Sequence, residues 1–269
     1  MTSPLPAITS PTNPRVKAAV RLRGRRERES TGLTLIDGAR ELRQALAAGA
    51  SVETVFVTQS QVRSDEARAA LQDAEDKVPD IVEVSEAVIA KLAFGDRSDG
   101  IVAIVRTGST DLESLRLTSG VPLVVVVEGV EKPGNLGAIL RTADGAGASG
   151  LIAADPLTDL FNPNAIRASL GTIFRVPLAA ASSPATLDWL TTRDIAPIAA
   201  RVDGATPYTD VDMRRPVAIV LGREATGLSA AWDDPRVTAV RIPMLGTADS
   251  LNVSVAAAIM LYEAVRQRA

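Results

Sequence analysis

Apolar and polar positions follow two different periods along this chain, and stretches of the two kinds alternate. Short runs rich in β-branched residues are typical of strands, whereas apolar positions three and four residues apart are typical of helices. In the N-terminal part the pattern predicts strands at 33–36, 52–57, 81–84 and 101–105 and helices at 39–48, 64–76 and 86–92. One further helix is expected to begin at Asn13-Pro14, because Asn caps helices well and Pro suits the first helical position.

A second alternating series follows residues 107–120, which show no clear period. It opens with the valine-rich run 121–127, a pattern typical of a strand buried on both faces of a parallel sheet. The pattern then predicts strands at 151–154, 174–178, 195–200, 216–221 and 237–242 and helices at 135–146, 163–170, 184–192 and 251–267. We therefore expect an α/β protein with a smaller N-terminal domain over residues 1–107, a linker over 108–120 and a second α/β domain over 121–269.

Composition narrows the possible chemistry. The 269 residues include neither cysteine nor histidine, so disulfides and the usual nitrogen or sulfur metal sites are not expected. The commonest general base is also missing, and catalysis would have to use other side chains or an external cofactor. No apolar run approaches the roughly 20 residues of a membrane span. The N-terminus lacks the pattern of a signal peptide, which predicts a cytoplasmic protein.

Charge is distributed unevenly. The net charge is −3, yet the segment 15–29 carries seven basic residues against two acidic ones. The basic residues are Arg15, Lys17, Arg21, Arg23, Arg25, Arg26 and Arg28. Such a cluster is compatible with a surface that contacts phosphates, and equally with a solvated helix face.

Loops rich in Gly or Pro follow three of the strands expected in the second series, at 128–135, 221–229 and 242–254. Ligands bind beyond the carboxyl ends of strands in open α/β sheets, and helix starts there suit phosphate. The first and third loops also have an ordinary explanation, with Asn135 or Ser250 as a helix cap and Arg141 as a surface charge. Three such loops in one domain favour a single binding site. Gly145, Gly147 and Gly150 match a dinucleotide-binding pattern, but they lie between a helix and a strand, the reverse of the required order.

Three motifs in these loops resemble those of a known family. Asn135-x5-Arg141, Leu221-Gly-x-Glu-x-x-Gly-Leu228 and Ile242-Pro-Met-x5-Ser-Leu-Asn-Val-Ser254 are similar, in order and spacing, to the motifs of the SpoU/TrmH RNA ribose 2′-O-methyltransferases. The resemblance covers about 121–264. It extends more loosely to Asn13-Pro-Arg-Val-Lys17 and Leu35-Ile-Asp-Gly-Ala-Arg40, which look like the family's substrate-binding domain.

The resemblance implies a fold and a set of site residues. The C-terminal region would be a SPOUT α/β methyltransferase domain with a trefoil knot, would act as a homodimer, and would bind S-adenosylmethionine. The cofactor would be held by Leu221, Gly222, Ile242, Met244 and Leu251. The residues that match active-site positions are Asn135, Arg141, Glu224, Ser250 and Asn252. RNA would contact Arg15, Lys17, Arg21, Arg25 and Arg26, with Arg167 as a further candidate.

Arg141 is the proposed base of the family, but a guanidinium with a pKa above ~12 is poorly suited to accept a proton. We expect Arg141 instead to hold a phosphate of the target and to stabilise the developing alkoxide. Ribosomal RNA is favoured over tRNA as the substrate, because the N-terminal domain resembles those of the family's rRNA enzymes. The alternatives are a tRNA methyltransferase and a non-catalytic RNA-binding or ribosome-assembly protein of the same fold.

Overall fold

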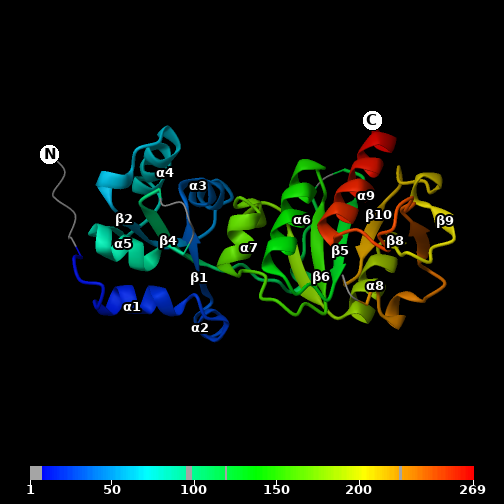
Figure 1. Ribbon diagram of the computed structural model, residues 1–269, viewed down its shortest axis with the longest axis horizontal. Helices are drawn as coiled ribbons and strands as arrows, with labels where there is room; N and C mark the ends of the chain where they lie inside the picture. The colour runs from blue at the N-terminus through cyan, green and yellow to red at the C-terminus, as the bar shows by residue number, and fades with distance from the viewer. Residues whose placement is uncertain (1–7, 95–98, 119, 224–225) are drawn as a thin grey trace. The chain divides into compact units, whose positions relative to one another are not determined.

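The computed structural model describes residues 8–94, 99–118, 120–223 and 226–269, and the chain divides into two compact units (Figure 1). The first unit contains Met1–Gly108 together with Phe161–Arg175, and the second contains Ser109–Leu160 and Val176–Ala269. The sequence pattern suggested one continuous domain over 121–269, but the segment Phe161–Arg175 within that range belongs to the first unit. The apolar side chains of this segment, among them Phe161 and Ile173, are buried within the first unit.

A four-stranded mixed sheet forms the centre of the first unit. Its strands lie in the order β1 (Leu33–Asp37), β4 (Ile101–Arg106), β2 (Val52–Val57) and β3 (Ile81–Glu83). Strand β4 runs antiparallel to both its neighbours, and β2 and β3 are parallel. The helices of this unit are α1 (Pro14–Arg21), α2 (Arg25–Thr31), α3 (Ala39–Ala47), α4 (Asp65–Glu75), α5 (Glu86–Leu92) and α7 (Pro163–Ala168). All four expected strands are present.

The basic N-terminal segment forms two helices rather than the single one expected. Helix α1 starts as predicted, with Asn13 accepting a hydrogen bond from the Arg15 amide, but it ends at Arg21. The chain turns at Leu22–Gly24 before α2 begins. The buried Arg28 donates to the carbonyls of Leu22 and Arg23 at 2.8 and 2.7 Å. These bonds satisfy carbonyl groups that the end of α1 leaves without helical partners, and so favour the break.

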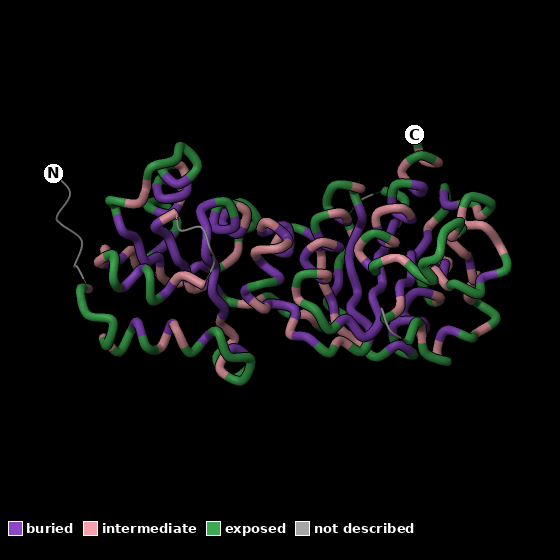
Figure 2. The backbone as a smooth tube through the Cα atoms, in the orientation of Figure 1, coloured by how far each residue is buried: buried purple, intermediate pink, exposed green. Residues whose placement is uncertain are grey.

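The second unit is built on a seven-stranded sheet in which all neighbouring strands are parallel. The strand order is β7 (Leu178–Ala181), β6 (Gly150–Ala154), β5 (Leu123–Glu128), β10 (Val217–Leu221), β8 (Ala196–Ala200), β11 (Thr238–Arg241) and β9 (Thr206–Pro207). Its helices are α6 (Pro133–Gly145), α8 (Ser183–Thr191) and α9 (Val253–Arg268), and α6 packs against α9. Figure 2 shows the central strands buried along their length.

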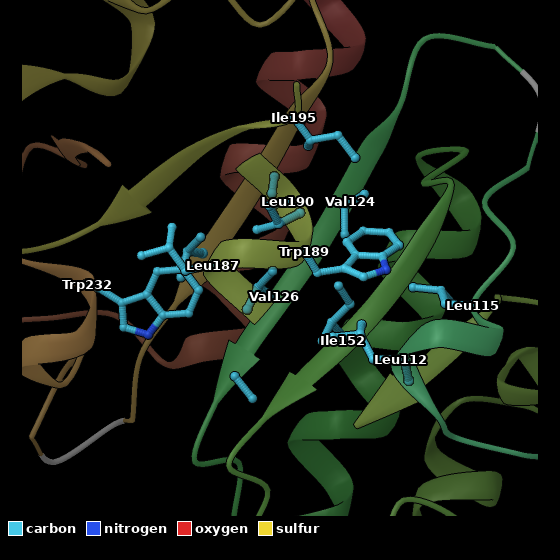
Figure 3. Close-up of a cluster of buried hydrophobic side chains, with 14 of the residues drawn as sticks. Leu112, Leu115, Val124, Val126, Ile152, Leu187, Trp189, Leu190, Ile195 and Trp232 are labelled. Carbon is cyan, nitrogen blue, oxygen red and sulfur yellow. The ribbon is translucent and has the colours of Figure 1, made fainter. Parts of the chain in front are cut away.

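Both tryptophans of the chain lie in the hydrophobic core of this unit. Trp189 and Trp232 are 4% and 1% exposed and belong to one cluster with Leu187, Leu190 and Val126 (Figure 3). Their fluorescence therefore reports on the folding of the second unit alone. Valines and alanines fill the strands of the sheet, as expected for strands buried on both faces.

Three predicted boundaries in this part are wrong. Of the strand expected at 174–178, only Leu178 lies in a strand, the alanine-rich β7, while Thr172–Phe174 is a short 3-10 helix in the first unit. The last helix begins at Val253 with Asn252, not Ser250, as its cap. Helix α6 begins at Pro133, so Asn135 lies in its first turn rather than at its cap. The helix–glycine–strand order around Gly147 is confirmed.

A buried carboxylate joins four segments at the carboxyl ends of the strands. Glu128, the last residue of β5, is 2% exposed. It accepts hydrogen bonds from the Ser183 hydroxyl at the start of α8 (2.7 Å) and from the amide and hydroxyl of Ser229 (2.8 and 2.6 Å). Ser183 also donates its amide to Asp155, which follows β6. A buried charge needs such partners, so the network fixes these segments relative to one another.

We therefore expect Glu128→Ala to lower the free energy of unfolding of the second unit by about 3 kcal/mol, because it removes the acceptor shared by the buried Ser183 hydroxyl and by the amide and hydroxyl of Ser229. Ser229→Ala, which removes one hydroxyl, should cost about 1 kcal/mol. Urea unfolding followed by tryptophan fluorescence measures both values. Equal losses in the two variants would contradict the central role of the carboxylate.

Candidate active site

A pocket of about 500 Å³ opens at the carboxyl end of the parallel sheet in the second unit. Its walls come from the segments that follow three neighbouring strands: 200–203 after β8, 221–223 with 226–228 after β10, and residues between 242 and 251 after β11. The first turn of α9 contributes Val253 and Ala256. Because β8 lies between β10 and β11, these segments converge on one side of the sheet.

The structure brings the predicted cofactor residues together. The pocket is lined by all five, namely Leu221, Gly222, Ile242, Met244 and Leu251, and also by Ser250. Glu224 lies outside the described residues. The lining is mainly apolar where Leu221, Ile242 and Leu251 contribute, and charged where Arg201, Asp203, Arg223 and Asp249 contribute. An apolar pocket with a few charged groups at its edge suits a ligand that combines a flat ring with ionised groups.

Gly222 must be glycine for this pocket wall to form. Its backbone lies so close to the other side of its own loop that a Cβ would come within 2.4 Å of the Gly227 carbonyl carbon. The loop is closed by reciprocal backbone hydrogen bonds of 3.0 Å between Arg223 and Gly227. Gly227 has a φ of +68°, which favours glycine at that position too. The two glycines of the second motif therefore shape a tight loop at the end of β10.

Two asparagines at the starts of different helices lie next to each other: Asn135 in the first turn of α6 and Asn252 at the cap of α9. Asn252 caps α9 by accepting hydrogen bonds from the amide and hydroxyl of Ser254 at 2.9 and 2.6 Å. Its side-chain amide nitrogen lies 3.5 Å from Oδ1 of Asn135 in the first turn of α6. Residues predicted from the first and third motifs are thus neighbours in space, and Asn252 both caps a helix and reaches across to another.

Arg141 lies on α6, almost two turns beyond Asn135, and is exposed. Within the part of the chain that the structure describes, its guanidinium makes neither a hydrogen bond nor an ion pair. It does not line the pocket itself. An exposed arginine without an internal partner is available to an anion from outside, such as a phosphate.

The loop after β8 was missed by sequence reasoning. Arg201 donates to Asp203 at 3.0 and 3.2 Å and also to Asp233, and these bonds raise the pKa of Arg201. The hydrogen bond from Arg201 likewise lowers the pKa of the Asp203 carboxyl. The loop is further anchored by the hydrogen bond of 2.8 Å from the Arg201 amide to Val240. The one available signal was the Arg-Val-Asp-Gly sequence directly after a predicted strand.

The candidate RNA-binding residues of α1 and α2 differ in their partners. Three of them form ion pairs: Arg15 with Asp80, Arg21 with Glu27 and Arg25 with Glu29. Lys17 and Arg26 are exposed and have no such partner among the described residues. Arg167 belongs to the first unit, where its guanidinium lies 3.6 Å from the buried carboxylate of Asp37.

Over the described ranges, no group of three or more acidic side chains is arranged to hold a metal ion. In the same residues, no helix has the length and apolar character needed to cross a bilayer.

Comparison with known proteins follows the division of the chain. A model of the SpoU rRNA Methylase family matches residues 122–262, and one of the MRM3-like substrate binding domain matches residues 13–103. The 23S rRNA (uridine(2479)-2′-O)-methyltransferase of Streptomyces viridochromogenes is 32% identical over 92% of this chain and 87% of its own length.

Solved structures agree in fold over nearly the whole chain. A crystal structure of an RNA 2′-O ribose methyltransferase is 43% identical, with a TM-score of 0.84 over 97% of this chain and 99% of that one. An AdoMet-bound rRNA methyltransferase from Sinorhizobium meliloti is 31% identical, with a TM-score of 0.85 over 97% of both chains. These matches confirm the expected fold class, a SPOUT methyltransferase domain with an N-terminal substrate-binding domain. The protein belongs to the SpoU rRNA methylase family.

Proposed function

We propose that this protein transfers a methyl group from S-adenosylmethionine to a ribose 2′-hydroxyl of ribosomal RNA in the cytoplasm. The observation that carries the proposal is the convergence of Leu221, Gly222, Ile242, Met244 and Leu251 on one pocket. The named relative that methylates 23S rRNA supports ribosomal RNA as the substrate. The N-terminal match to a substrate binding domain supports the same conclusion.

The pocket fits the cofactor in size and chemistry. Its volume of about 500 Å³ lies within the usual range for sites that bind molecules of this size. Apolar walls at Leu221, Ile242 and Leu251 suit the adenine ring. Gly222 has no side chain, so a ligand can come close enough to its backbone to form hydrogen bonds. Arg201 holds the Asp203 carboxylate by hydrogen bonds at the edge, where a carboxylate suits ribose hydroxyls or a positive charge. When bound, the cofactor supplies an electrophilic methyl group.

The protein's part in the reaction is mainly alignment. The target hydroxyl must lie in line with the methyl group, and Asn135 with Asn252 offers amide groups beside the pocket for that purpose. Arg141 would bind a phosphate of the target nucleotide and stabilise the oxygen as its proton is lost. Ser250 lines the pocket and would contribute a hydroxyl at the same end. Glu224 remains part of this proposal through its motif position.

We expect Arg141→Ala to lower methyl transfer roughly 100-fold or more, because it removes the cation that offsets the developing negative charge. S-adenosylmethionine affinity should stay within about twofold, since Arg141 does not line the pocket. The assay uses methyl-labelled cofactor with rRNA or tRNA, followed by nucleoside analysis. Arg214→Ala, an exposed arginine paired with Asp212, is the matched control. Label on a base instead of ribose, or normal turnover by Arg141→Ala, would refute the assignment.

We expect Gly222→Ala to weaken S-adenosylmethionine binding at least about tenfold, because a Cβ there collides with backbone and must displace the pocket wall. Titration calorimetry measures the affinity, and tryptophan fluorescence checks that the second unit is folded. Gly134→Ala adds the same methyl group to α6 where nothing lies within 4 Å and should leave the affinity unchanged. Wild-type affinity in Gly222→Ala would show that the ligand does not approach this loop.

A homodimer is the second part of the proposal. Val255 and Tyr262 are 47% and 53% exposed and lie two turns apart on α9, so they share one face of the helix. The helix also packs against α6, which carries Asn135 and Arg141. Exposed apolar residues aligned along a helix are typical of protein interfaces. We place the dimer contact on this face of α9, next to the active-site residues.

Val255→Glu should therefore shift the protein from dimer to monomer in light scattering coupled to size exclusion, because it would bury a charge at the contact. Leu157→Glu adds the same charge at an apolar residue with 50% exposure elsewhere in the second unit, and should leave the mass unchanged. A dimeric Val255→Glu protein, or a monomeric wild type, would exclude this arrangement.

The basic helices α1 and α2 complete the proposal as an RNA-contacting surface. Lys17 and Arg26 are exposed and form no ion pair in the part of the chain that the structure describes, and Arg15, Arg21 and Arg25 would exchange carboxylate partners for phosphates. Exposed ion pairs contribute little stability, so such an exchange costs little.

A further inference from the structure

Arg40 is an exposed basic residue of the first unit that no ion pair holds within the described chain. It is the second residue of α3 and is exposed. Within the described ranges it makes no hydrogen bond or ion pair, whereas Arg43, on the same helix, is paired with Asp73 at 3.0 Å. An arginine without a partner keeps its full charge for an external anion.

A second arginine reaches the same helix from a distant part of the sequence. Arg175 is the last residue of the segment Phe161–Arg175, and its guanidinium lies 3.4 Å from Oε1 of Gln44 on α3. Gln44 is one helical turn beyond Arg40, so the side chains of these two residues lie on one face with Cβ atoms about 5–6 Å apart. Arg175 is also exposed. Two exposed guanidinium groups therefore flank Gln44.

The segment Phe161–Arg175 packs tightly against α3. Gly171 adopts a φ of +80°, and a Cβ there would come within 2.8 Å of Gln44 Cβ and 3.0 Å of Glu41 Cα. Phe161 accepts a hydrogen bond of 2.7 Å from the buried Thr34 hydroxyl on β1. These contacts fix the position of Arg175 before any ligand binds, and a preorganised donor loses less entropy on binding.

The acidic residues nearby do not cancel this charge at the surface. Asp37 is buried and lies against Arg167. Glu41 is also buried, and desolvation raises the pKa of its carboxyl although Arg167 and Arg40 act in the opposite direction. A third carboxylate, the partly exposed Asp99, accepts a hydrogen bond of 3.1 Å from the Ala39 amide at the start of α3. Within the described residues, none of the three carboxylates forms an ion pair with Arg40 or Arg175.

We propose that Arg40, Gln44 and Arg175 form a second RNA-contacting surface of the first unit, separate from that of α1 and α2. The inference rests on the proposed function, which supplies RNA as the substrate. Guanidinium groups bind phosphates with two parallel hydrogen bonds, and the Gln44 amide can bond a phosphate, a 2′-hydroxyl or a base edge. A protein partner is less well matched, because the large exposed hydrophobic residues of the described chain all lie in the second unit.

The test measures binding of the full-length protein to an rRNA fragment at several salt concentrations. Arg40→Ala and Arg175→Ala should each weaken binding several-fold and reduce the slope of log affinity against log salt by about 1, because each removes one phosphate contact. The double variant should lose roughly 10-fold or more. Arg43→Ala is the matched control on the same helix and should bind within twofold of wild type. S-adenosylmethionine affinity should stay unchanged in all four proteins.

Wild-type affinity and salt dependence in the double variant would overturn the proposal, as would a wild-type protein that does not bind RNA. A loss in Arg43→Ala equal to that in Arg40→Ala would show a general charge effect instead of a surface built around Gln44. A wild-type protein that binds RNA but transfers no methyl group would contradict the proposed function and leave this surface standing. The two proposals can therefore fail separately.

Discussion

The arrangement of the pocket depends on a carboxylate that does not belong to it. Glu128 is buried at the end of β5 and is stable there only because hydroxyl and amide donors surround it. One of those donors is Ser229, so the segment after β10 is anchored behind its tight turn at Gly222 and Gly227. The wall of the pocket is thus positioned by a carboxylate on the neighbouring strand. That carboxylate does not line the pocket, so the lining residues remain available to the ligand.

Strand order explains both what the sequence predicted about the site and what it missed. Strand ends with Gly-rich or Pro-rich loops can be recognised from the residues, and the family motifs placed Leu221, Gly222 and Ile242 in one site. Which strands are neighbours depends on long-range pairing, and no local pattern encodes it. The structure places β8 between β10 and β11, so the loop with Arg201 and Asp203 joins the pocket. The strand expected at 174–178 failed for a related reason, because Phe174 and Arg175 belong to the other unit.

The partners of charged side chains are likewise not readable from local sequence. The density of basic residues in 15–29 is plain in the sequence, but their partners are not. Arg28 is buried and bonds the carbonyls at the end of α1, while Arg23 donates to three carbonyls at the end of α5. Those two arginines serve the fold, since they satisfy the ends of helices. The charge left for the proposed RNA contact on α1 and α2 is therefore smaller than the composition suggests.

The segment Phe161–Arg175 connects the two units, because it lies between β6 and β7 in the sequence but packs in the first unit. Phe161–Arg175 lies within the range matched by the SpoU family, yet it packs in the first unit against β1 and α3. Its fit is specific, because Gly171 has no room for a side chain and Arg167 faces the buried Asp37. An N-terminal domain taken from another family member would have to preserve those contacts. The segment therefore belongs to the family match in sequence and to the first unit in structure.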